Sequence, residues 1–197
     1  LEISVYTEPQ LAWITSDESR VISNGSIIKF NTGVEFDIFF RPNYAFTIGV
    51  EMNNQGGRII YEDTTLFQQT SSPPLEVPGG SSVKHNLQYI GVPLGLKLKA
   101  AELGYTTFYF QAGLNPLFNL KAYTSSEQLS LDRENIQTEV PAYSLNYFVS
   151  VGLEYRLAGN TAFMAGLKWS AGFNDVTEND LANNNLNSVG LHLGILF

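Results

Sequence analysis

Hydrophobic and polar residues alternate with a period of two along most of this chain. Such alternation places one set of side chains on each face of a β-strand. None of these segments repeats its apolar residues at helical spacing. The pattern therefore predicts an all-β chain of about eight strands. The alternating segments are residues 3–15, 27–40, 45–52, 87–100, 107–122, 143–157, 162–173 and 189–197.

The connections between these strands alternate between short and long. Tight turns lie at 41–44, 100–104 and 158–160. The remaining connections are long and polar, and they cover residues 16–26, 61–85, 123–140 and 174–187. Outer-membrane barrels have this asymmetry, with short periplasmic turns and long extracellular loops. The layout predicts a single domain, 1–197, that forms a closed antiparallel up-and-down transmembrane β-barrel.

The second face of the strands carries small and charged residues. A narrow barrel interior needs small side chains for space and paired charges for neutrality. We therefore expect a charge network inside the barrel. Its predicted members are Glu35, Asp37, Glu51, Lys97, Lys99, Glu154, Arg156 and Lys168. Glu8 and Lys121 fall on the same face of the alternation.

A soluble lipocalin-like barrel that binds ligands, apolar inside and polar outside, would also alternate. The position of the aromatic residues favours the membrane barrel, because many of them fall near predicted strand ends. Trp and Tyr collect there when their amphipathic rings lie at a lipid–water interface. The predicted belts contain Trp13, Phe40, Tyr44, Tyr105, Tyr147, Tyr155, Trp169 and Phe197.

The last predicted strand keeps its alternation to the final residue of the sequence. Its apolar row is Val189, Leu191, Leu193, Ile195 and Phe197. In a closed barrel this strand pairs with the first one, so that no backbone edge faces lipid. This ending resembles that of outer-membrane proteins in which a C-terminal strand with a final aromatic residue is the insertion signal.

Residues 89–122, YIGVPLGLKLKAAELGYTTFYFQAGLNPLFNLKA, resemble a known family. The small outer-membrane barrels of Bacteroidota, the PorT-like group of OmpA-OmpX-like eight-stranded barrels, carry a YIEIPL-type strand that ends in Lys. Gly91 stands where an acid is common. The resemblance implies an integral protein of a bacterial outer membrane, after removal of a signal peptide, and implies no reaction. The matching residues are Tyr89, Ile90, Val92, Pro93, Leu94 and Lys97.

Composition removes several other classes of function. The net charge of -8 argues against nucleic acid as a partner. Cysteine is absent, which excludes disulfides and thiolate metal sites. The sequence has no run of about 18 apolar residues that could form a transmembrane helix. We expect no cofactor, and contacts with lipid, lipopolysaccharide or detergent along the barrel wall.

Three functional hypotheses remain for such a barrel. Catalysis is disfavoured, because neither His192, predicted inside the barrel beside a carboxylate, nor His85, predicted in the second long loop, has an evident Ser or Asp companion. A narrow pore or transport-associated barrel is the second hypothesis. About eight strands leave space only for side chains, which argues against an open channel. The favoured hypothesis is a binding or assembly subunit within a larger outer-membrane complex.

The long loops carry the features that favour binding. Acids outnumber bases in them, and their Asp and Asn oxygens give only a weak indication of calcium binding, since the spacing of an EF-hand is lacking. The segment SSPPLEVPGG is stiffened by proline and lies close to several apolar residues, as a docking arm would. The loop acids are Asp17, Glu18, Glu62, Asp63, Glu76, Glu127, Asp132, Glu134, Glu139, Asp175, Glu178 and Asp180.

Pro9, Pro93 and Pro116 fall inside predicted strands. Proline cannot donate a ladder hydrogen bond, and a closed barrel has no free edge to accommodate it. We expect bulges or irregular pairing at these three positions.

Overall fold

The computed structural model describes residues 1–16, 21–23, 25–61, 65–67, 75–77, 80–126, 131–135, 141–173 and 184–197. The described residues form strands and turns. The strands are β1 Glu2–Ser16, β2 Val21–Ser23, β3 Ile27–Arg41, β4 Tyr44–Tyr61, β5 Thr65–Phe67, β6 Leu75–Val77, β7 Ser82–Gly91, β8 Leu94–Lys99, β9 Thr106–Ser126, β10 Leu131–Asn135, β11 Tyr143–Ala158, β12 Thr161–Gly172 and β13 Asn184–Leu196.

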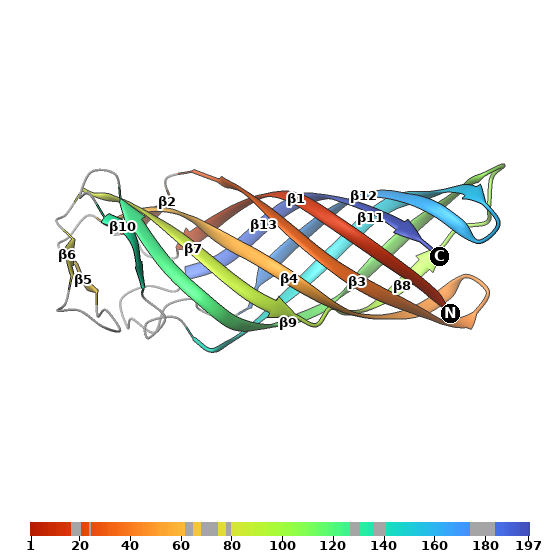
Figure 1. The fold of residues 1–197 in the computed structure, drawn as a ribbon, viewed down its shortest axis with the longest axis horizontal. Coiled ribbons are helices and arrows are strands. Elements are labelled where there is room, and N and C mark those ends of the chain that lie inside the picture. Colours follow the sequence, from red (N-terminus) through yellow and green to blue (C-terminus); the bar gives the residue numbers. More distant parts are fainter. Residues whose placement is uncertain are drawn as a thin grey trace.

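The long strands close into an antiparallel barrel (Figure 1). Going around it, β1 is followed by β3, β4, the consecutive pair β7 and β8, β9, β11, β12 and β13, and β13 pairs with β1 again. At the closing seam the backbones of Ile3 and Phe197 exchange two hydrogen bonds of 3.1 and 2.8 Å. Within the described residues, the barrel therefore has the eight strand positions that the alternation predicts.

The two ends of the barrel differ. Three tight turns, β3–β4, β8–β9 and β11–β12, lie at the end that also holds both termini (Figure 1). We call this the turn end and the opposite one the loop end. In outer-membrane barrels the turn end faces the periplasm. The short strands β2, β5, β6 and β10 belong to the long connections, where alternation gave no sign of them.

The three prolines coincide with interruptions of the ladder, as predicted. Pairing of β1 with β13 skips Glu8 and Pro9. The strand between β4 and β9 is broken at Val92 and Pro93, which separates β7 from β8. Pro116 lies across this break, and its carbonyl accepts a 3.0 Å hydrogen bond from the Val92 amide. Each missing N–H thus falls where the backbone is already irregular.

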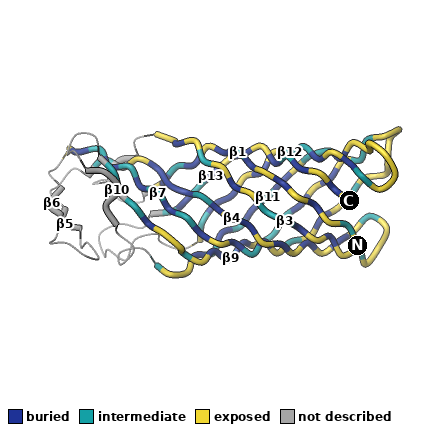
Figure 2. The backbone as a smooth tube through the Cα atoms, viewed as in Figure 1, coloured by how far each residue is buried: buried dark blue, intermediate teal, exposed yellow. Residues whose placement is uncertain are grey.

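Exposed and buried positions alternate along the barrel strands (Figure 2). The exposed positions carry large apolar side chains, and many of the buried positions carry polar ones that face inward. Val151, Leu167 and Leu191 of three adjacent strands are about half exposed at mid-barrel. This is the arrangement of a barrel whose wall contacts hydrocarbon and whose interior is polar. No helix among the described residues is long and apolar enough to cross a membrane.

A β-bulge changes the facing of one predicted interior base. The ladder between β7 and β9 runs from Gln88↔Lys121 to Tyr89↔Asn119 and leaves Leu120 as the extra residue. Because a bulge shifts the alternation by one position, Lys121 is exposed on the outer wall instead of facing inward. Ala122 takes the buried position.

Several strands continue past the segments that the alternation marked. The sequence predicts a loop through residue 85, but β7 begins at Ser82. Lys84 and His85 are therefore strand residues. β4 runs to Tyr61 and β9 to Ser126. Beyond the apolar wall both faces of a strand can be polar, and the hydrophobic period that identifies strands is then lost.

Glycines make room for a large ring inside the barrel. Gly152 and Gly166 are direct partners on β11 and β12. A Cβ atom at Gly152 would lie 2.7 Å from the Tyr109 ring, and one at Gly166 only 2.4 Å from the Tyr109 hydroxyl oxygen. The small residues on this face therefore accommodate the ring of Tyr109, which is buried inside the barrel.

Candidate functional site: the charged interior and the vestibule at the turn end

At mid-barrel, Lys168 is the centre of a buried charge cluster. Its ammonium lies 3.3 Å from Glu8 Oε2 and 3.6 Å from Glu51 Oε2, and all three side chains are almost completely buried. The same ammonium lies 4.9 Å from the centre of the Phe148 ring. Tyr6 donates a 2.5 Å hydrogen bond to Glu51. Charge and aromatic packing together hold this lysine across the interior.

Glu51 also binds two amides. Asn53 and Asn115 donate hydrogen bonds of 2.6 and 2.7 Å to its Oε1 atom. A buried carboxylate satisfied by a cation, a hydroxyl and two amides is fixed in position. Tyr6, Asn53, Asn115 and Phe148 were not among the predicted network members, because neutral residues on the inner face give no separate signal in the sequence.

Closer to the turn end, Lys97 forms a second cluster. It is 0% exposed, and its ammonium lies 2.7 Å from Asp37 Oδ2 and 3.3 Å from Glu154 Oε1. Thr47 donates a 2.6 Å hydrogen bond to Asp37. Glu35 interacts electrostatically with both Lys97 and Lys168. Glu35 therefore adds negative charge near both lysines.

The interior near the loop end is filled differently. Buried apolar side chains replace charges there, and the largest of them are Ile14, Leu87, Tyr89, Leu117 and Leu186. They come from β1, β7, β9 and β13. The interior thus consists of an apolar layer towards the loop end and two charged layers below it.

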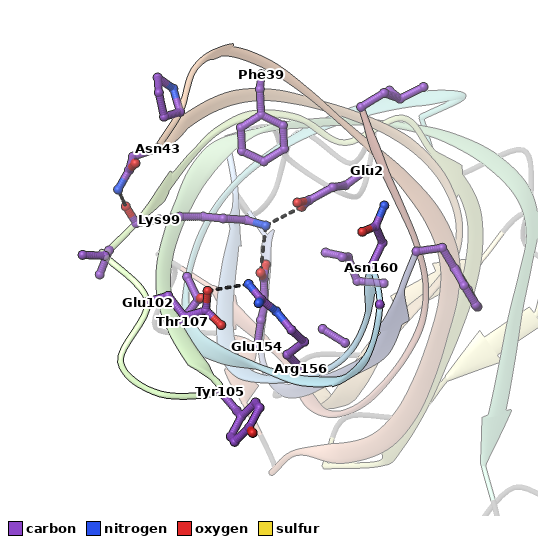
Figure 3. A pocket seen from close by; sticks show the side chains of 18 residues that line it. Glu2, Phe39, Asn43, Lys99, Glu102, Tyr105, Thr107, Glu154, Arg156 and Asn160 are labelled. Atoms are coloured by element: carbon purple, nitrogen blue, oxygen red, sulfur yellow. Dashed lines mark hydrogen bonds and ion pairs between the residues drawn. The ribbon is translucent and has the colours of Figure 1, made fainter.

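At the turn end the interior opens into a vestibule of about 570 Å³ (Figure 3). Lys99 crosses it, pairing with Glu2 and lying 2.7 Å from Glu154 Oε2. The centre of the Phe39 ring lies 5.1 Å from Lys99 Nζ. Glu154 contacts both Lys97 and Lys99, so the vestibule floor is continuous with the inner network.

Arg156 lies outside the interior, against the sequence-based expectation. Its side chain is half exposed at the vestibule rim, and it pairs with Glu102 from the β8–β9 turn (Figure 3). The alternation of β11 continues through Arg156, but the enclosed part of the barrel ends at Glu154, two residues earlier. The structure places the other seven predicted network residues on the inner face, Lys99 at the vestibule.

Both histidines are buried, and they lie in different layers. His192 Nδ1 lies 3.1 Å from Glu8 Oε2, and its ring packs 4.3 Å from the Tyr6 ring. His85 is buried on β7 opposite Gly57, near the loop end. No Ser, Thr or Cys side chain is seen paired with His192 among the described residues. The described part of the chain also lacks any group of three or more His, Cys, Asp or Glu side chains that could hold a metal ion.

The residues predicted for the aromatic belts lie on the outer wall in two groups. Phe40 packs against Tyr44 and Tyr105 against Tyr155 at the turn end. Tyr147 packs edge-on against Trp169, 5.3 Å between ring centres, further towards the loop end. Trp13 is on the outer face of β1 and Phe197 at the closing seam.

The apolar row of β13 also faces outward. Val189, Leu191, Ile195 and Phe197 are exposed and Leu193 is partly exposed. The structure therefore presents this row on the barrel wall.

Of the acids predicted for the loops, Glu76 lies in β6, and Asp132 and Glu134 in β10. The other nine lie outside the described residues.

Comparisons with known proteins identify an outer-membrane β-barrel. Residues 7–135 match a family model described as "Outer membrane protein beta-barrel domain". Neisserial surface protein A is similar in structure, with a TM-score of 0.53 and 14% identity, covering 98% of this chain and 95% of that one. OprG from Pseudomonas aeruginosa has a TM-score of 0.50 and 8% identity, over 99% and 94%. No curated protein matches the chain.

Ail, the attachment invasion locus protein of Yersinia pestis, is also similar, with a TM-score of 0.45 and 14% identity over 100% of this chain and 98% of that one. At these identities the solved structures report on the fold alone. The family match and the fold agree on an integral barrel of the outer membrane.

Proposed function

Because this chain belongs to the outer membrane protein beta-barrel domain family, we propose that it is a non-enzymatic subunit with a plugged interior. Its acidic loops or its outer wall dock another outer-membrane component. The motif YIGVPLGLKLK supports assignment to the PorT-like barrels of Bacteroidota. The barrel serves as a rigid support, and recognition takes place on its outside.

The buried lysines carry this proposal. Lys97 and Lys168 project from separate parts of the wall, from β8 and β12, and each is held by two carboxylates. Moving either side chain aside would leave charges buried without partners, which is strongly unfavourable. A fixed plug of this kind supports a structural role better than transport.

The buried position of the histidines supports a non-enzymatic role. His192 is 2% exposed and engaged with Glu8 and Tyr6, so a substrate would have to displace the packed interior to reach it. A catalytic base needs a nucleophile or an activated water within reach of a substrate. The vestibule cations Lys99 and Arg156 are each paired with a carboxylate.

A narrow pore is the second candidate, since the vestibule opens towards the interior. We expect the purified barrel in a planar bilayer to show no unit conductance, because Lys97 and its carboxylates close the path beyond the vestibule. Single-channel recording in 1 M KCl would measure this. Regular current steps that scale with salt concentration would contradict the plugged interior.

If the loops or the outer wall dock another outer-membrane component, the chain should have a stable partner in the native membrane. We expect an affinity-tagged full chain, solubilised in mild detergent from its own outer membrane, to co-purify with a second outer-membrane component at a fixed ratio. Size-exclusion chromatography with mass spectrometry measures that ratio. A parallel chain with residues 71–80 replaced by a Gly-Ser linker tests the proline-stiffened arm. Recovery of the barrel alone and monomeric would contradict a docking role.

A further inference from the structure

The outer wall near the loop end carries a group of basic residues on neighbouring strands. Arg58 of β4 and Lys84 of β7 are direct cross-strand partners. Lys121 of β9 lies opposite Gln88 of β7. Lys29 of β3 lies opposite the buried Gln10, so it belongs to the inner face and not to this group. We call Arg58, Lys84 and Lys121 the loop-end basic patch.

Among the described side chains, the bases of the patch have no carboxylate partner, whereas the bases of the interior and the vestibule do. Lys97, Lys99, Lys168 and Arg156 each pair with a carboxylate. Within the part of the chain whose side chains are described, no carboxylate pairs with a base of the patch. Arg58 and Lys84 are instead direct cross-strand partners that carry the same charge. Like charges on directly opposed strand positions destabilise a sheet, and an external anion would remove that cost.

The patch borders the apolar wall. On β4 and β7 the outward pair Met52 and Ile90 is followed by Asn54 and Gln88, and then by Arg58 and Lys84. On β9, Phe118 precedes Lys121 by three residues, with the bulge at Leu120 between them. Lysine and arginine at such a boundary bury their aliphatic stems and extend their charges to the headgroup level. A ligand at the patch would therefore touch hydrocarbon surface and basic groups together.

The residues at the loop-end boundary of the apolar wall differ from one side of the barrel to another. On β11 and β12 the rings of Tyr147, Trp169 and Phe173 contact one another on the outer wall. No base is described on the outer wall near these rings. Among the described residues, positive charge on the outer wall near the loop end is thus concentrated on β4, β7 and β9. A localised anionic ligand requires such a concentration, and a uniform interfacial belt does not produce it.

From this placement we propose that the loop-end basic patch binds the phosphorylated headgroup of an anionic lipid in the loop-side leaflet. The lipid's acyl chains lie along Met52, Ile90 and Phe118. Juxtamembrane bases attract anionic lipid headgroups in this way. The proposal stands independently of the plugged interior and of the docking partner.

Lipid binding can be measured on the full chain in zwitterionic phosphatidylcholine nanodiscs. The probe is lipid A, an acylated disaccharide that carries two phosphates, and bound lipid is counted by native mass spectrometry. We expect Arg58→Gln with Lys84→Gln to weaken retention by about thirtyfold and Lys84→Gln alone by about fivefold. Retention should also fall as salt rises, because counterions screen the phosphates.

Arg41→Gln is the matched control, since it removes one exposed base at the turn end. It should leave retention unchanged. A heat-modifiability gel shift checks that each variant is folded. Equal loss in Arg41→Gln and Lys84→Gln, or wild-type retention by the double variant, would overturn the patch. Equally tight binding of de-acylated disaccharide phosphate, or of an acidic soluble protein, would overturn a lipid as its ligand.

Discussion

Lys97→Met should lower the free energy of unfolding by about 3–5 kcal/mol, because it leaves Asp37 and Glu154 buried without their shared cation. Methionine has nearly the same length as lysine, so the loss reports charge more than packing. Urea titration in detergent micelles, followed by the fluorescence of Trp13 and Trp169, measures the change. If the variant does not fold, its yield in the heat-modifiable form gives the same comparison.

Two variants sharpen the Lys97 experiment. Lys121→Met removes an exposed base and should change stability by less than about 0.5 kcal/mol. Combining Lys97→Met with Asp37→Asn and Glu154→Gln should recover part of the loss, since the uncompensated charges are then gone. An unfolding midpoint for Lys97→Met equal to that of the wild type would contradict a charge network that supports the barrel.

Leu167→Arg should cost about 2–4 kcal/mol in a bilayer, because it places a charge on the lipid-facing wall at mid-barrel. Leu167 lies on β12 between Val151 of β11 and Leu191 of β13, all facing outward. Denaturant titration in phospholipid vesicles measures the effect.

Leu103→Arg provides the position control. Leu103 is 68% exposed in the β8–β9 turn, outside the apolar wall. An arginine there should cost no more than about 1 kcal/mol, as the penalty falls to near zero at the interface. Equal costs at Leu167 and Leu103 would mean that the wall does not face hydrocarbon, and a soluble barrel with the opposite orientation would then have to be considered.

The strands and the facing of their side chains could be predicted, because successive residues of each barrel strand face two different environments. One is the apolar surroundings of the outer wall, and the other is the polar interior. Leu94, Leu96 and Leu98 point outward on β8, and Lys97 and Lys99 point inward, as the period of two requires. Where the wall leaves the apolar layer, that contrast disappears. The start of β7 at Ser82 therefore has no signal in the sequence, and the hydrophobic pattern wrongly predicts a loop at Lys84 and His85.

Two other differences have local causes. Lys121 lies outside because the ladder inserts Leu120 as a bulge, and nothing in the composition of LFNLKA marks the extra residue. Arg156 lies at the rim because the enclosed interior is shorter than the strand that carries it. The charged residues of the network could be predicted from facing, whereas their pairing could not, since it depends on the register between strands distant in sequence. Lys97 and Asp37, 60 residues apart, are an example.

The seam between β1 and β13 imposes an order on biogenesis. Each of these strands finds one of its two neighbours at the opposite extreme of the sequence. Until β13 has been synthesised, β1 retains a row of amides and carbonyls that hydrocarbon cannot solvate. Membrane entry therefore has to be delayed, or guided by assembly factors, until β13 can pair with β1. Pairing over such sequence distances is intrinsically slow.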